Sequence, residues 1–155
     1  MTEARVGIVD VLVLRRAGAA WEVLVLERAE GTRCTGAWEI VHGRIEDGER
    51  PEDAALREVR EETALAVARL YSITVNPFYL AGTGLVQLAV VFAAVVDAAA
   101  PVPVLSEEHA RAEWLPVERA LDRLAWPRER QALRDAAHLL RGGDAGPVED
   151  VLRVR

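Results

Sequence analysis

The chain has 155 residues, a formal net charge of −6, one cysteine and 51% hydrophobic residues. A chain of this length fits one domain that buries about two-thirds of its unfolded surface without disulfides or structural metal. The acidic balance excludes general nucleic-acid binding, because sequence-independent phosphate contacts need a surplus of Lys and Arg. A single cysteine excludes internal disulfides and multi-cysteine zinc sites, and it favours a reducing compartment.

The composition is rich in Val, Leu and Ala and poor in aromatic residues, which suits an α/β domain. No apolar run approaches membrane-spanning length. We therefore expect a cytoplasmic protein with no membrane partner and no nucleic-acid partner. The sequence leaves the oligomeric state open.

The chain opens with two apolar, β-branched runs at residues 6–14 and 21–26, joined by Arg-Arg-Ala-Gly-Ala-Ala, which predicts a hairpin. Residues 30–37 carry Gly, Thr, Cys and charge without periodicity. They predict a surface loop that leads into a short extended piece at 38–41. A helix is expected to start at Pro51, because proline suits the first turn, acids follow it, and apolar residues then repeat at helical spacing.

The second half of the chain predicts another hairpin followed by a loop, a strand and two helices. Apolar runs at 70–79 and 85–96 flank Ala-Gly-Thr-Gly and form the hairpin. The later elements are an exposed proline loop around 101–103, a short strand at 112–115, and helices at 117–124 and 127–140. Residues 1–141 are expected to form the domain, and residues 142–155 a polar C-terminal tail that is loosely held from Asp144 onward.

Clustered acids give the strongest functional signal. Residues 43–65 read GRIEDGERPEDAALREVREETAL. Within them, Glu58, Glu61 and Glu62 stand at i, i+3 and i+4, so a helix places all three on one face with Cβ atoms roughly 5–6 Å apart. On most helices such a set is a solvated acidic face. Clustered carboxylates with few competing ligands also suit Mg²⁺ or Mn²⁺ bound together with substrate phosphates.

The residues that precede these acids favour the metal-binding interpretation. Gly43, Glu49 and Arg57 stand at spacings that let a loop fold back onto the helix, with Arg57 clamping Glu49. The whole segment resembles the Nudix box, which runs Gly, five residues, Glu, seven residues, Arg-Glu-apolar-any-Glu-Glu-any-Gly-apolar. Six of its seven fixed letters match. The departure is Ala64 where the box has Gly, which removes the usual left-handed helix end.

The resemblance covers most of the chain and implies a single-domain Nudix sandwich with a mixed sheet between helices. It implies hydrolysis of a diphosphate linkage in a nucleotide-like small molecule, with Mg²⁺ or Mn²⁺ neutralising the diphosphate and activating water. Glu58 and Glu62 would be the principal metal ligands, and Glu61 a further ligand or a base. Glu108 resembles the additional catalytic carboxylate that such enzymes bring from outside the box. An exposed loop acid is an equal alternative for it, and Glu107 could take its place.

Weaker signals concern substrate binding. Arg28 could meet phosphate or form a salt bridge. His42 could reach substrate from the loop before the box, although a plain hydrogen-bonded role is more common. Trp38 and Trp126 could stack on a heterocycle or anchor the core.

Flanking motifs bear on the substrate. WEIVHG before the box, and SEEHARAEWL followed by WPRERQAL, are similar to dihydroneopterin triphosphate pyrophosphatases. They favour a triphosphate such as dihydroneopterin triphosphate or a dNTP. The alternative is ADP-ribose or another nucleoside diphosphate derivative, although relatives with that activity usually carry a proline where this chain has Leu80. An alternative of another class is a non-catalytic sensor of a nucleotide metabolite, and the intact acid set argues against it.

Overall fold

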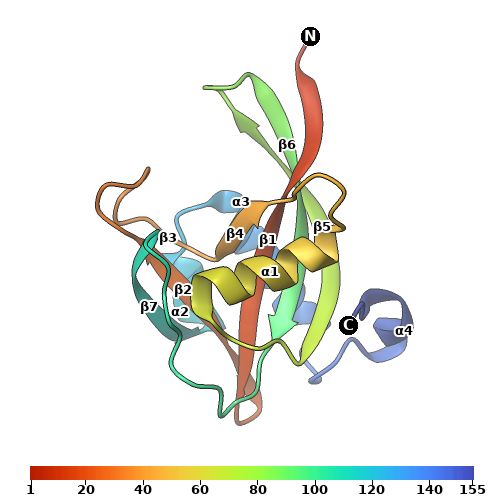
Figure 1. Cartoon of the computed structure of the whole chain (residues 1–155). Coiled ribbons are helices and arrows are strands. Elements are labelled where there is room, and N and C mark those ends of the chain that lie inside the picture. Colours follow the sequence, from red (N-terminus) through yellow and green to blue (C-terminus); the bar gives the residue numbers. More distant parts are fainter.

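The computed structural model describes the whole chain, Met1–Arg155, and its centre is a seven-stranded mixed sheet (Figure 1). The strands are β1 (Glu3–Ala17), β2 (Ala20–Arg28), β3 (Trp38–Glu39), β4 (Val41–Arg44), β5 (Arg69–Leu80), β6 (Leu85–Val95) and β7 (His109–Pro116). The helices are α1 (Pro51–Thr63), α2 (Val117–Arg123), α3 (Pro127–Leu139) and α4 (Glu149–Leu152), with a 3₁₀ turn η1 (Gly146–Val148) before α4. None of these helices combines the length and apolarity needed to span a bilayer.

Five strands run in the order β3-β2-β1-β6-β5, while β4 pairs with β1 and β7 pairs with β2. The contact between β1 and β6 is parallel and every other strand pairing is antiparallel. The expectation of an α/β fold with a mixed sheet between helices is therefore confirmed.

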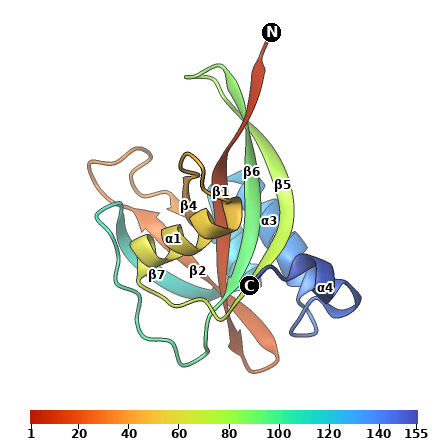
Figure 2. The same cartoon turned by 45° about the vertical axis from the view of Figure 1, so that its right-hand side comes forward.

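The central strand β1 separates two hydrophobic layers by simple alternation of its side chains. Alternate residues from Val9 to Val13 join the cluster that also holds buried residues of α1, whereas Leu12 and Leu14 join the cluster that holds those of α3. Figure 2 shows α1 on the near face of the sheet and α3 behind it. By the same alternation, the buried Asp10 belongs to the α3 face.

Both predicted hairpins, the loop at 30–37, the helix from Pro51 and the later strand and helices are present. One expectation is wrong, because the segment from Asp144 is not loosely held. It forms η1 and α4, and it then runs back beside β5, where Val154 N–H donates to the Leu70 carbonyl at 2.8 Å. The Tyr71 hydroxyl, whose ring belongs to the core, donates to Glu149 at 3.0 Å.

Candidate active site

The loop between β4 and α1 is held against the helix by one arginine. Arg57 makes a bidentate ion pair with Glu49, with both N···O distances at 2.9 Å, and its Nη2 also donates to the Arg44 carbonyl at 2.8 Å. The Arg57 hydrogen bonds and the backbone N–H of Glu46 lower the pKa of Glu49 to about 2. The clamp predicted from the sequence is therefore present, and it ties the loop to the first half of α1.

Gly43 in β4 makes room for an acid of the helix. A Cβ atom at this position would lie 2.0 Å from Cδ of Glu58 and 2.2 Å from its Oε1. Any side chain here would push the Glu58 carboxylate aside. The glycine of the box thus leaves the space that the Glu58 carboxylate occupies against β4.

The three helix acids differ in their surroundings. Glu62 is 4% exposed, and its Oε2 has no hydrogen-bond partner. Burial, followed by repulsion from Glu58 and Glu108, raises the pKa of Glu62 to about 9. Burial also raises the pKa of Glu58, although its hydrogen bond from Arg57 opposes this. Glu61 points outward, with its side chain 56% exposed.

Helix α1 ends in the left-handed conformation that the family's glycine would supply. Ala64 has φ 59° and ψ 14°, and its N–H donates to the Arg60 carbonyl. The expectation that alanine removes this helix end is therefore wrong. The chain keeps the same exit from the helix with a side chain in a region where glycine is preferred.

The residues present suit a hard divalent cation. No three carboxylate, imidazole or thiol groups are arranged to hold a metal ion as they stand. Arg57 Nη1 instead donates to Glu58 at 2.8 Å and to Glu61 at 3.2 Å. Nevertheless, the donors are all oxygens, and a buried carboxylate oxygen of Glu62 is unpaired. With a pKa of about 9, Glu62 is neutral near pH 7, and ionising it in this buried position requires a positive group such as a bound cation. Glu58 and Glu62 are the residues best placed to hold such an ion.

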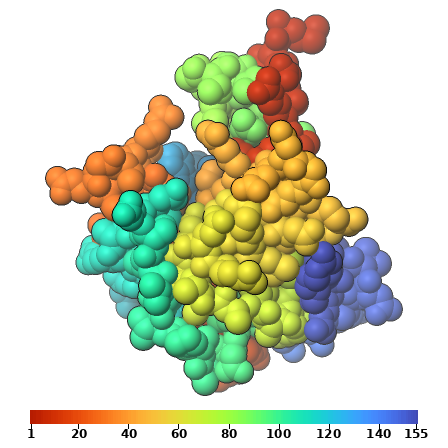
Figure 3. Space-filling view, in the orientation of Figure 1, coloured from red at the N-terminus to blue at the C-terminus, as the bar shows by residue number.

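A cavity of about 1090 Å³ lies beside these acids. Its walls combine acids (Glu39, Glu58, Glu61, Glu108), arginines (Arg28, Arg33, Arg44, Arg128) and aromatic rings (Phe78, Tyr79, Trp126), and Glu62 is not among the lining residues. In Figure 3 the orange loop and the green tip of the β5–β6 hairpin stand out from the body of the molecule. Residues 33–34 of that loop and 76–80 of that hairpin line the cavity. The exposed side chains of Arg33 and Arg44 form no ion pair within the chain, so they are free to meet an anion.

The other residues singled out from the sequence are divided between cavity and core. Arg28 and His42 line the cavity, and so does Glu108, whereas Glu107 is exposed and does not. The prediction that Trp38 could bind substrate is not supported. Its ring is buried in the core, with the guanidinium carbon of Arg123 4.7 Å from the ring centroid, and it does not reach the cavity. Its role as a core anchor is the one the structure supports.

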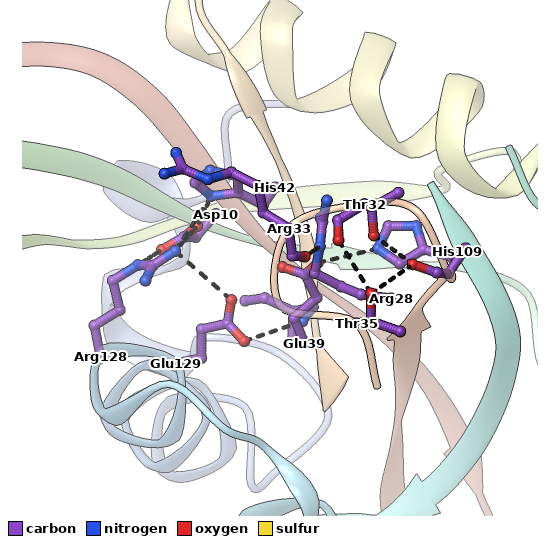
Figure 4. Close-up of polar contacts among 12 residues, drawn as sticks. Asp10, Arg28, Thr32, Arg33, Thr35, Glu39, His42, His109, Arg128 and Glu129 are labelled. Atoms are coloured by element: carbon purple, nitrogen blue, oxygen red, sulfur yellow. Dashed lines mark hydrogen bonds and ion pairs between the residues drawn. The ribbon is translucent and has the colours of Figure 1, made fainter. Parts of the chain in front are cut away.

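Beneath the cavity lies a chain of buried charged groups that sequence reasoning missed (Figure 4). Glu39 accepts hydrogen bonds from Arg28 Nη1 at 2.7 Å and from His109 Nε2 at 3.2 Å. Burial alone would raise the pKa of Glu39, but these two partners outweigh it and lower the pKa. The expected salt bridge of Arg28 is thus real, and Arg28 also lines the cavity.

The second half of this chain of charges centres on Asp10. Its carboxylate is bound by His42 Nδ1 at 2.6 Å and by Arg128 Nε at 2.8 Å. Glu129, the neighbour of Arg128, is fully buried and accepts a hydrogen bond from the Ile40 N–H at 3.1 Å. The one available signal was Asp10 itself, an acid inside the otherwise apolar run at residues 6–14.

Known proteins agree with this architecture. Residues 4–136 match the NUDIX domain family. An octanoyltransferase of Myxococcus xanthus is 34% identical over 131 residues, which make up 83% of this chain and 36% of that protein. The chain therefore spans about a third of the length of that relative.

Solved structures share the fold. The crystal structure of a C. elegans Ap4A hydrolase binary complex matches with a TM-score of 0.72 at 20% identity, over 87% of this chain and 97% of that one. The E. coli dihydroneopterin triphosphate pyrophosphohydrolase matches with a TM-score of 0.68 at 22% identity, over 86% of this chain and 96% of that one. Together with the box and with the family match over most of the sequence, these likenesses lead to one conclusion: the chain belongs to the Nudix family.

Proposed function

We propose that this protein is a divalent-metal-dependent pyrophosphohydrolase that cleaves the diphosphate linkage of a nucleoside-triphosphate-like small molecule. The observation that carries the proposal is the buried Glu62, which has an unpaired oxygen and stands one helical turn after Glu58, an acid that lines a cavity of about 1090 Å³. Family membership supports the same class of reaction. A single cysteine favours a reducing, cytoplasmic setting.

Each part of the site has a proposed task. Glu58 and Glu62 would hold Mg²⁺ or Mn²⁺, with Glu108 available from the lining of the same cavity. The ion would supply charge neutralisation on the diphosphate and activation of the attacking water. Glu61, exposed at the rim, would orient that water and accept its proton. Arg33 and Arg44 would bind phosphate oxygens, while Arg57 keeps Glu58 and the loop in place.

We propose a triphosphate substrate, dihydroneopterin triphosphate or a dNTP, in preference to ADP-ribose. The flanking motifs around Trp38 and Trp126, which are similar to those of dihydroneopterin triphosphate pyrophosphatases, support this choice. A triphosphate also carries a terminal phosphate that the free arginines Arg33 and Arg44 could hold. ADP-ribose or another nucleoside diphosphate derivative is the alternative substrate, and a non-catalytic sensor is the alternative of another class.

One experiment separates these possibilities. The pure protein is incubated with Mg²⁺ and a panel of dihydroneopterin triphosphate, dNTPs, dinucleoside polyphosphates and ADP-ribose, and the products are identified by mass spectrometry. We expect pyrophosphate release from a triphosphate, with the higher kcat/KM, and loss of turnover in excess EDTA. Faster cleavage of ADP-ribose would overturn the substrate, and binding without turnover of any member of the panel would indicate a sensor.

Isosteric variants test the acids. Glu58→Gln and Glu62→Gln are each expected to lower kcat by roughly 100-fold or more, because an amide cannot replace a carboxylate ligand of the ion. The protein should stay folded, because Gln has the shape of Glu, removes repulsion at position 58 and resembles the neutral form of Glu62. Glu107→Gln is the matched control, since that exposed acid does not line the cavity. Near-normal turnover of Glu62→Gln would show that the ligand assignment is wrong.

A further inference from the structure

Arg128, at the start of α3, presents a hydrogen-bond donor that is held in one position. Its Nε and Nη2 bind the two oxygens of Asp10 at 2.8 and 3.3 Å, and its guanidinium carbon lies 4.1 Å from the centroid of the Phe78 ring. The side chain is 12% exposed and lines the cavity. The third nitrogen, Nη1, has no hydrogen-bond partner within the chain. It is therefore a fixed donor that remains available to a ligand.

The charge of this arginine is already compensated. Burial alone would raise the pKa of Asp10, but the His42 hydrogen bond and the Arg128 charge outweigh it, so the pKa is lowered and the carboxylate stays ionised. Burial, with Asp10 next in effect, raises the pKa of Glu129 well above its ordinary value and favours its neutral form. Arg128 and Asp10 thus form a neutral pair. Such a pair suits a polar but uncharged ligand atom better than a phosphate. A phosphate would be bound more strongly by Arg33 and Arg44, whose charges have no partner within the chain.

Beside its polar partners, Arg128 is flanked by two aromatic rings. Phe78 and Trp126 both lie within cation–π distance of its guanidinium, with ring centroids at 4.1 and 5.7 Å, and both line the cavity together with Pro77. Aromatic faces of this kind stack with a planar ring. The box acids Glu58 and Glu61 belong to α1, and the free arginines belong to the loop at 30–37 and to β4, whereas the aromatic residues come from β5 and the start of α3. The lining of the cavity is thus divided between a set suited to phosphate and an aromatic part.

We propose that the aromatic part binds a planar heterocycle through a ring carbonyl, with Arg128 Nη1 donating to the carbonyl oxygen. This inference rests on the proposed function only in assuming that the substrate carries a heterocycle. Arginine has hydrogen-bond donors and no acceptor, so it can donate to the ring carbonyl of a 6-oxopurine or a pterin. Adenine has an exocyclic amino group in place of that carbonyl, and two donors would then face each other. The site therefore favours guanine, hypoxanthine or pterin rings over adenine.

The test is direct binding of nucleosides, which carry no phosphate and cannot be hydrolysed at a diphosphate. Inosine and adenosine differ in the 6-oxo and 6-amino groups and in the N1 proton, and their dissociation constants are measured by calorimetry without metal. We expect inosine to bind the unmodified protein about tenfold more tightly or better, as for other arginine–carbonyl contacts. Arg128→Met should remove most of this preference, whereas Arg134→Met, an exposed arginine on the same helix, should keep it.

Two results would overturn the inference. The first is equal binding of inosine and adenosine by the unmodified protein, which needs no variant to fold. The second is a loss of pyrophosphate binding in Arg128→Met with the inosine preference unchanged, because Arg128 would then be a phosphate contact. Either result leaves the hydrolase proposal standing, and a protein that prefers inosine yet cleaves no triphosphate would contradict the hydrolase proposal alone.

Discussion

A methyl group on Gly43 would meet Cδ of Glu58 at 2.0 Å, so the only space for this carboxylate against β4 is the one that glycine leaves. The neighbouring atoms belong to a flexible side chain, so Glu58 can move while the backbone stays. Gly43→Ala is therefore expected to keep the fold and displace the acid.

Displacement by about 1 Å can lower turnover roughly 100-fold, and we expect a loss of kcat of that order for Gly43→Ala. Steady-state kinetics and the urea unfolding midpoint measure the two effects separately. Gly142→Ala is the matched control, because a Cβ atom there meets nothing within 4 Å. An active Gly43→Ala variant would mean that the position of Glu58 does not matter for the reaction.

The Arg57–Glu49 clamp predicts a pH dependence of stability. Its hydrogen bonds lower the pKa of Glu49 to about 2 from an ordinary value of 4.5. A lowered folded-state pKa stabilises the fold above the unfolded pKa, and this contribution disappears as the pH falls through the folded pKa. Glu49→Gln should therefore unfold at lower urea than the unmodified protein near neutral pH, and the gap should narrow between about pH 4.5 and 2.

The control for this experiment is Asp47→Asn, a change to an exposed acid of the same loop with no ion pair. Its midpoint should follow that of the unmodified protein at every pH. A gap for Glu49→Gln that stays constant down to acid pH would show that Arg57 does not hold Glu49 ionised.

The sequence was informative where function depends on a local pattern. The box acids, the clamp and the helix from Pro51 lie within some twenty residues, and their spacing allowed Arg57 to reach Glu49, as it does in the structure. Strands and hairpins followed from β-branched runs and turn residues.

What the sequence could not provide were contacts between distant residues. Asp10 and Arg128 are 118 positions apart, and neither stands in a motif that predicts the other. A tryptophan such as Trp38 looks the same in the sequence whether it stacks on a ligand or packs in the core. Only the residues around it in the fold distinguish the two roles. The C-terminal segment lacks periodicity, and its order comes from edge contacts with β5 that no local pattern reveals.

Ala64 gives a prediction about stability alone. At φ 59° an alanine is strained by roughly 1 kcal/mol relative to glycine, and the greater freedom of glycine in the unfolded chain offsets part of this. Ala64→Gly should raise the free energy of unfolding by roughly 0.5 kcal/mol with kcat unchanged. The control is Ala66→Gly, at an exposed residue nearby that does not have a positive φ, and this change should lower the free energy of unfolding. Destabilisation by both changes would show that Ala64 is not strained.

The C-terminal segment provides a test of the architecture. Ala145 is 3% exposed, Leu70 exchanges backbone hydrogen bonds with Val154 and Arg155 at 2.8 and 3.2 Å, and the Tyr71 hydroxyl binds Glu149. Deleting residues 144–155 removes these bonds and uncovers part of Tyr71. At about 1 kcal/mol for each hydrogen bond, the free energy of unfolding should fall by roughly 2–4 kcal/mol.

Activity should respond differently to the same deletion. No residue of the segment lines the cavity, so the folded fraction of the truncated protein should keep its kcat/KM. Urea unfolding followed by tryptophan fluorescence, together with kinetics at low temperature where the truncated chain is folded, measures both effects. Tyr71→Phe is the milder companion variant, and a loss of about 1 kcal/mol would assign that share to the Glu149 hydrogen bond. The burial of Ala145 and the backbone hydrogen bonds of Leu70 should stabilise the fold. An unchanged unfolding midpoint after truncation would therefore show that the segment does not make these contacts in solution.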